Sequence, residues 1–142
     1  MPFRLIYSSE AAPGLARVEL EEMLAESRIR NQAHGITGVL LFVEGAFLQI
    51  LEGEKADVHN LMARIELDPR HRGIKVFYEE EVGDRAFASW SMAYLSPSAQ
   101  EVAKWAELDG ATTIGNVLAS IESNPGRLPM MVINILKTIA AP

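Results

Sequence analysis

The spacing of apolar residues divides the N-terminal part of the chain into strands and helices. Residues 3–8 alternate between two faces, with Phe3, Leu5 and Tyr7 on one and Arg4, Ile6 and Ser8 on the other, which is typical of a strand. From Ala16 the apolar positions recur at helical intervals as far as Gly35, a residue favoured just beyond a helix C-terminus. The whole pattern predicts strands at residues 3–8, 36–43, 46–51, 74–79 and 88–95, and helices at residues 16–34 and from residue 58 to before Pro69.

This β-α-β-β-α-β-β order predicts a ferredoxin-like α+β sandwich, with both helices on one face of the sheet. The middle strands are apolar on both faces, since Phe47 points one way and Leu48 the other, so the second face needs its own cover. We expect helices of the tail to supply this cover. Their apolar stripes are Ile114, Val117, Leu118 and Ile121, and then Met130, Ile133 and Leu136 beside Lys137. The chain would then consist of the sandwich, residues 1–96, and a helical extension, residues 97–142.

Three polar side chains point into the predicted core. The periodicity places Tyr7, Asn31 and Gln49 on otherwise apolar faces. A buried polar group without a partner costs about 1–3 kcal/mol. Each residue alone has an ordinary explanation: a tyrosine at the rim, an asparagine that satisfies a helix end, or a glutamine that faces water from an edge strand. Together, two amides and a phenol favour a flat polar heterocycle bound between the helices and the sheet.

Composition excludes several classes of protein. The 142-residue chain has no cysteine, which excludes disulfides, cysteine–zinc sites and thiol catalysis. With only three histidines besides, we expect no metal site. A formal net charge of −6 argues against nucleic-acid binding. The N-terminus has the pattern of a strand and not of an export signal, and the charge-poor residues 128–136 are too few to span a bilayer. We therefore expect a cytoplasmic protein that binds neither nucleic acid nor a membrane.

Five motifs, in order and at sensible spacing, resemble those of the BLUF family of blue-light sensors that use FAD. They are RLIYSS at residues 4–9, SRIRN at 27–31 with GITGVL at 35–40, GAFLQILEG at 45–53, DPRH at 68–71, and Phe87 with WSM at 90–92. Together they span about residues 3–95, which we expect to form the flavin-binding domain. The tail resembles the helical extension of short, stand-alone members.

The resemblance implies a flavin held between the two helices: FAD, with FMN or riboflavin as alternatives. Asn31 would pair with the C4 carbonyl and N3 edge of the ring, because an amide both donates and accepts hydrogen bonds. Gln49 would lie between the ring and Tyr7. Arg30 stands where many relatives carry Asn, which leaves open whether it contacts the ring or a phosphate. The remaining implied ligands are Arg64 and Arg70, either at the phosphate end or as exposed cations, with Asp68 and His71 from the matched turn.

The resemblance also implies a photocycle. Blue light excites the flavin, and Tyr7 supplies an electron and then a proton through Gln49. Gln49 ends rotated or tautomerised with rearranged hydrogen bonds, while the flavin is chemically unchanged. The chain would thus be a switch and not an enzyme. Trp90 and Met92 lie two apart on the predicted fifth strand and so share a face, either as residues that approach Gln49 or as plain core.

We expect the light signal to be passed on through association with another protein chain. We expect a downstream protein partner, light-dependent binding and a homo-oligomer. Met130 and Met131 are either core or an adaptable contact surface.

The sequence also allows three alternatives. An acylphosphatase-like hydrolase on the same fold could use Arg30 and Asn31, although there is no glycine-rich phosphate loop. A flavin-free ferredoxin-like interaction module would leave the three inward polar residues unexplained. A flavoenzyme would be expected to carry a dinucleotide-binding glycine motif, which this sequence does not have.

Overall fold

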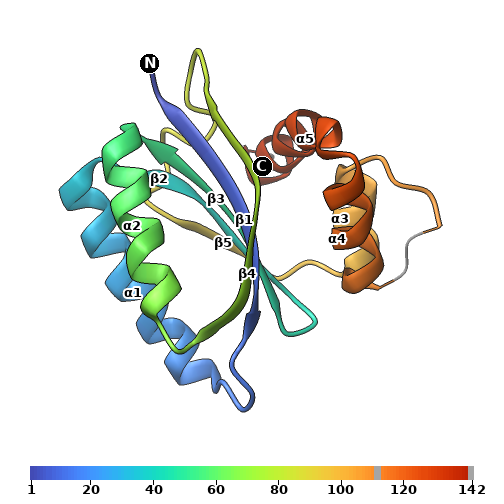
Figure 1. Ribbon diagram of the computed structural model, residues 1–142, viewed down its shortest axis with the longest axis horizontal. Coiled ribbons are helices and arrows are strands. Elements are labelled where there is room, and N and C mark those ends of the chain that lie inside the picture. The colour runs from blue at the N-terminus through green and yellow to red at the C-terminus, as the bar shows by residue number, and fades with distance from the viewer. Residues whose placement is uncertain (111–112, 141–142) are drawn as a thin grey trace.

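The fold is one sheet covered by helices on both faces (Figure 1). The computed structural model describes residues 1–110 and 113–140. The strands are β1 (Phe3–Ala11), β2 (Thr37–Val43), β3 (Ala46–Gly53), β4 (His71–Glu81) and β5 (Ala93–Leu95). One face carries α1 (Arg17–His34) and α2 (Lys55–Leu67). The other carries α3 (Ala99–Trp105), α4 (Ile114–Ser123) and α5 (Leu128–Ala140), with the 3₁₀ turn η1 (Pro125–Arg127) before α5.

The strand order β4-β1-β3-β2-β5 is a ferredoxin-like sheet extended by the edge strand β5. β3 runs antiparallel to both β1 and β2, so β1 and β2 are parallel and α1 is the crossover between them. β4 pairs antiparallel with β1, which makes α2 the crossover from β3, and β5 pairs parallel with β2. The predicted fold class is confirmed. β3 is central, so the explanation of Gln49 as a water-facing edge residue is wrong.

Helix α1 has a defined start and a defined end. The Ala16 backbone N–H donates to the Glu19 carboxylate at 3.3 Å, which satisfies one of the free amides of the first turn. At the other end Gly35 adopts a left-handed φ of 65°, a conformation that favours glycine, and the chain passes straight into β2. This ending fixes Asn31 in the last turn of α1, where the helix meets the sheet.

Two apolar cores lie on opposite sides of the sheet. The α1/α2-side core includes Leu5, Leu24, Phe47, Leu51 and Leu61. The tail-side core includes Ile6, Leu48, Ile50, Val117, Ile121 and Met131. The expectation that β3 is apolar on both faces, and that the tail covers the second face, is confirmed.

The tail differs from the prediction in two respects. The short helix α3 was not predicted, although Ser98 and Glu101 form a capping box, in which the Glu101 N–H donates to the Ser98 hydroxyl at 3.1 Å. In α5 the predicted stripe was wrong, because Met130 and Ile133 are 44% and 45% exposed. The buried stripe is Leu128, Met131, Val132 and Ile135. Helix α5 is apolar on much of its circumference, so periodicity alone could not decide which stripe faces the sheet.

The bounds of β4 also differ from the prediction. This strand begins at His71, three residues before the predicted start at residue 74, and continues to Glu81. Its partner β1 extends to Ala11, beyond the predicted end at residue 8, and continued pairing with β1 explains the greater length of β4. Within the described ranges, no helix is long and apolar enough to cross a bilayer.

Candidate functional site

A cleft lies between α1, α2 and the sheet. It is a narrow cleft that is partly open to solvent. Its lining residues are Met23, Ser27, Arg30, Asn31, Leu40, Gln49, Leu61, Arg64, Ile65, Asp68, Arg70 and His71. Every residue that the sequence analysis assigned to flavin binding lines this cleft except Tyr7, which is bonded to Gln49 and fully buried.

Asn31 presents an unpaired acceptor in this cleft. Its side chain is 0% exposed, and its Nδ2 donates to the backbone carbonyl of Ser91 at 2.8 Å. Its Oδ1 is the one buried side-chain polar atom without a partner in the part of the chain that the structure describes. Asn31 therefore does not use its side chain to cap its own helix. A buried, unpaired carbonyl oxygen is complementary to an N–H donor such as the N3–H of a flavin ring, so the site fits that group.

Gln49 joins Tyr7 to Met92 in one chain of hydrogen bonds. Tyr7 and Gln49 are directly opposite each other on β1 and β3 and point to the same face. The Tyr7 hydroxyl donates to Gln49 Oε1, and Gln49 Nε2 lies 3.3 Å from the Met92 sulfur, which accepts its N–H. Burial raises the pKa of the Tyr7 phenol well above its usual range, and the negative charge of Asp68 adds to this effect. The phenol therefore stays protonated and acts as the donor.

The segment before β5 corrects one prediction. Strand β5 begins only at Ala93, so Trp90 and Met92 are not on a strand and do not share a face. Met92 is buried in the α1/α2-side core, whereas Trp90 packs against the tail-side core, with its ring centroid 6.5 Å from that of Phe87. A turn breaks the period-two alternation, because the Trp90 N–H donates to the Phe87 carbonyl at 3.1 Å. Met92 is the residue next to Gln49.

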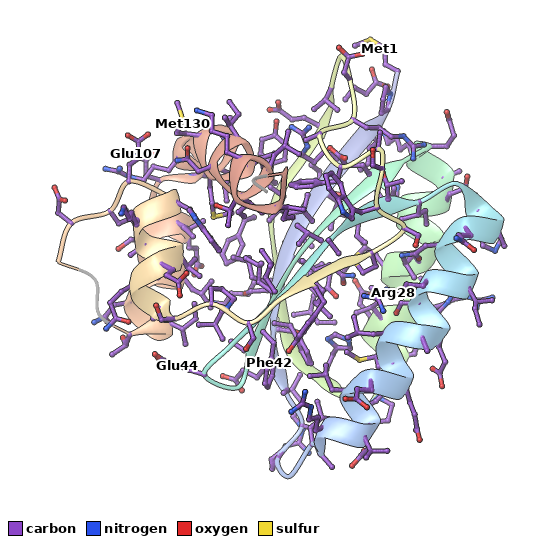
Figure 2. The ribbon with its side chains drawn as sticks, turned by 180° about the vertical axis from the view of Figure 1, so that it is seen from behind. Met1, Arg28, Phe42, Glu44, Glu107 and Met130 are labelled. Atoms are coloured by element: carbon purple, nitrogen blue, oxygen red, sulfur yellow. The ribbon has the colours of Figure 1, made fainter. Side chains whose placement is uncertain are left out.

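Two side chains of α1 hold this segment by its backbone. Arg28 Nε donates to the Met92 carbonyl at 3.0 Å, alongside the bond from Asn31 to Ser91. Figure 2 labels Arg28 on α1, next to the sheet. The roles of Arg28 and Ser91 could not be predicted from the sequence, because a contact between a side chain and a distant backbone carbonyl does not depend on the residue type that supplies the carbonyl. Met23 and Ser27, which also line the cleft, could have been found, since they precede Asn31 by eight and four residues on one helix face.

The turn at residues 68–71 brings an ion pair and a histidine to the cleft. Arg70 Nη2 lies 2.7 Å from Asp68 Oδ2, and this contact lowers the pKa of the Asp68 carboxyl and raises that of Arg70. His71 Nδ1 lies 2.7 Å from the Ser9 hydroxyl, and its ring is 4.9 Å from that of Phe47. Burial lowers the pKa of His71 below its usual value, so the imidazole is neutral near neutral pH.

Two arginines are more available to an anion than Arg70. Arg30 and Arg64 line both this cleft and the adjoining hollow at the His34 end of α1. Among the described residues neither forms a salt bridge, whereas Arg70 is engaged by Asp68. The cleft therefore has an amide end, formed by Asn31 and Gln49, and a cationic mouth. No group of three or more acidic or histidine side chains in the described ranges is placed to hold a metal ion.

Comparison with known proteins identifies the family. The sequence profile of the BLUF family, described as sensors of blue-light using FAD, matches residues 3–93. The chain belongs to the BLUF family. A BLUF domain is a flavin-based blue-light sensor, and the bonded Tyr7–Gln49 pair of this chain is consistent with its switch.

The relatives of this BLUF chain differ in length. It is 37% identical over 89 residues to photoactivated adenylate cyclase subunit beta of Euglena gracilis, a match that covers 62% of this chain and 10% of that protein. The match therefore covers only about a tenth of the length of these curated relatives. The solved structure of BlsA in its photo-activated state is 29% identical, with a TM-score of 0.82 and coverage of 96% of this chain and 95% of that one. BlrP1 of Klebsiella pneumoniae, solved with FMN and cyclic diGMP, is 27% identical, with a TM-score of 0.65 and coverage of 89% and 36%.

Proposed function

We propose that this BLUF chain binds FAD in the cleft between α1 and α2 and acts as a blue-light switch that changes its association with a protein partner. The observation that supports this most strongly is the chain of hydrogen bonds from Tyr7 through Gln49 to Met92, beside the unpaired Oδ1 of Asn31. Tyr7 and Met92 flank the switchable amide of Gln49, and Asn31 Oδ1 is a ready acceptor for a ring N–H. A flavin-free ferredoxin-like interaction module would require neither feature.

Each end of the cleft has a role in this proposal. Asn31 Oδ1 accepts the ring N3–H, while its bond to Ser91 fixes the amide orientation. Arg30 and Arg64 attract the phosphates of FAD or FMN at the mouth, where Arg70 contributes less because Asp68 neutralises it. His71 lines the ring pocket as a neutral imidazole. FAD is the cofactor in the family description, and BlrP1 has been solved with FMN; both flavins carry phosphate that Arg30 and Arg64 could bind.

The switch follows from the chemistry of a primary amide. The bound flavin supplies the absorption of blue light and a strongly oxidising excited state. The Tyr7 phenol holds its proton toward Gln49 Oε1, so an electron and a proton can leave it along one path. A half-turn of the Gln49 side chain would present its NH₂ group to Tyr7 and remove the donor from Met92. This rearrangement would then change the contacts of the segment before β5, which contains Met92.

The output is proposed to be association and not catalysis within this chain. In this proposal residues 1–96 sense light, and residues 97–142 form an extension that reports it on the opposite face of the sheet. A homo-oligomer or a separate partner would read the change. BlsA and this chain match over nearly the whole of each, which supports residues 1–142 as one structural unit that includes the helical extension.

A glutamine variant tests the proposal. Gln49→Leu is expected to bind flavin with a similar absorption spectrum but to lose the light-induced shift, because leucine cannot exchange a donor for an acceptor. The matched control is Gln32→Leu, since Gln32 lies on α1 and is exposed to solvent. A normal light response in Gln49→Leu would refute the assignment. The absence of flavin from the unaltered protein would favour a flavin-free module or a hydrolase.

A further inference from the structure

Glu52 is a buried carboxylate on the sheet face opposite the cleft. It follows Gln49 by three residues on β3, so the two side chains point to opposite faces. Its side chain is 0% exposed, and Arg4, its cross-strand neighbour on β1, holds it with Nη2 and Nε at 2.8 and 2.9 Å from Oε2. The proposed photochemistry gives this carboxylate no role.

The remaining bonds of Glu52 go to the backbone of the chain between β4 and β5. Its carboxylate accepts the Ala86 N–H at 3.0 Å and the Phe87 N–H at 2.8 Å. Such charge-assisted bonds are stronger than neutral ones. A buried ion pair by itself stabilises a fold little, because removing both charges from water is costly. An apolar pair could fill this space, but only an acceptor such as this carboxylate can hold two backbone amides there.

The segment held by Glu52 leads to the switch. From Phe87 the chain turns through Trp90, whose carbonyl accepts the Gly38 N–H at 3.1 Å, and reaches Met92 next to Gln49. Glu52 and Gln49, two side chains of one strand, therefore bind the two ends of one segment from opposite faces of the sheet. Between these two points the backbone is also held by the bonds from Gly38 to Trp90 and from Asn31 to Ser91, so a displacement of the backbone at Met92 can be transmitted to the Glu52 anchor.

We propose that Glu52 is a positioning residue that anchors the Ala86–Phe87 backbone and so holds Met92 against Gln49, which sets the lifetime of the light-activated state. This inference rests on the proposed function. Recovery of the dark state restores the hydrogen bond from Gln49 to Met92. If Glu52 no longer held the backbone at Ala86 and Phe87, Met92 would return to Gln49 more slowly. Recovery of the dark state would then slow.

The test is a double-mutant cycle read by dark recovery of the flavin absorption after a blue flash. In Glu52→Gln an NH₂ group replaces one acceptor oxygen and faces a backbone N–H, so one anchor bond is lost. We expect recovery to slow by about threefold or more in this variant and by much less when Met92→Leu is already present, because coupled residues give non-additive effects. Glu81→Gln, at an exposed carboxylate of β4, is the matched control and should recover at the unaltered rate.

The outcomes separate the inference from the proposed function. Equal slowing by Glu52→Gln with and without Met92→Leu would show a purely structural role and overturn the inference, as would unchanged or faster recovery. If Glu52→Gln does not fold, Arg4→Gln/Glu52→Gln, which removes both charges, is measured in the same cycle with the same expectation. Absence of a light-induced shift in the unaltered protein would instead defeat the proposed function, and it is recorded before any variant is compared.

Discussion

At the scale of the residue, the site depends on which hydrogen-bonding groups are already engaged. Asn31 has one partner and one unpaired oxygen, Tyr7 and Gln49 are bonded to each other, and Arg70 is committed to Asp68. A buried acceptor without a donor destabilises the protein without a ligand and favours a ligand that brings the donor. The same atom therefore links folding stability to flavin affinity.

Replacement of Asn31 by leucine tests this link. Asn31→Leu removes an unpaired acceptor along with one bond to Ser91, so we expect the free energy of unfolding of the flavin-free protein to change by less than about 1 kcal/mol. Flavin affinity should fall by about tenfold or more, since one hydrogen bond to the ring is lost. Urea unfolding and flavin titration measure the two quantities. A large loss of stability with unchanged flavin affinity would assign Asn31 to the fold alone.

His71 gives a pH-dependent prediction. Burial lowers its pKa in the folded chain below the unfolded value of 6.5. As the pH falls through 6.5, the unfolded chain therefore takes up a proton first, and the free energy of unfolding declines by up to about 1.4 kcal/mol per pH unit. The lowered pKa of Asp68 acts only at more acidic pH, below its usual 3.8.

The matched variants for this prediction are His71→Asn and His34→Asn. Urea unfolding at pH 7.5 and pH 5.5 should show a smaller loss of stability in His71→Asn than in the unaltered protein. His34 is exposed at the end of α1, so His34→Asn should keep the full loss. An identical pH dependence in both variants would contradict the assignment to His71.

At the scale of the element, the central pair β2–β3 determines where Gln49 points. The backbones approach closely at Gly38, where a Cβ atom would overlap the carbonyl oxygen of Ile50, the residue after Gln49. Gly38 also donates its N–H to Trp90, so this position joins the hairpin to the segment before β5. Only glycine allows both contacts at once.

Gly38→Ala is therefore expected to be severe. Relief of the overlap requires movement of the backbone next to Gln49, and we expect a loss of about 3 kcal/mol or more in the free energy of unfolding. The control is Gly115→Ala in α4, where a Cβ meets nothing within 4 Å and better helix propensity should stabilise by about 0.5–1 kcal/mol. Chemical denaturation measures both variants. Similar stabilities would mean that the approach at Gly38 is not a tight constraint.

Most elements could be predicted from the sequence, because their periodicities are simple. The alternation at residues 3–8 predicted a strand and the helical spacing before Gly35 predicted a helix, and the structure has both elements, although β1 is buried on both faces, with Leu5 in one core and Ile6 in the other. The prediction of a strand from residue 88 was wrong, since the turn between Phe87 and Trp90 is set by a backbone hydrogen bond. The Tyr7, Asn31 and Gln49 cluster could be predicted from polar residues on apolar faces, whereas the Arg28 and Ser91 contacts depend on the tertiary arrangement of α1 and the segment before β5.

At the scale of the whole molecule, the sheet separates two apolar cores. The α1/α2-side core surrounds the cleft, and the tail-side core supports α4 and α5. Figure 2 shows Glu44 at the tip of the β2–β3 hairpin, and its carboxylate accepts the Ile114 N–H at the start of α4 at 3.4 Å. The hairpin that carries Gln49 thus also touches the tail.

Val117→Ala tests how separable the two cores are. Val117 is fully buried in α4, so its truncation should lower the free energy of unfolding by about 1–3 kcal/mol. The size of the light-induced absorption shift should stay unchanged, because the Tyr7–Gln49 pair lies on the other face of the sheet. Urea unfolding and dark and light absorption spectra measure the two effects. A reduced shift would show that tail packing reaches the flavin site.

The most direct test of the central claim is the absorption spectrum of the unaltered protein, purified in darkness, recorded before and after blue light. We expect a bound-flavin spectrum that shifts slightly to longer wavelength and relaxes in the dark, since Gln49 changes its hydrogen bonds while the flavin is chemically unchanged. A protein that stays colourless after reconstitution with FAD, or a flavin spectrum that light leaves fixed or bleaches, would contradict the central claim.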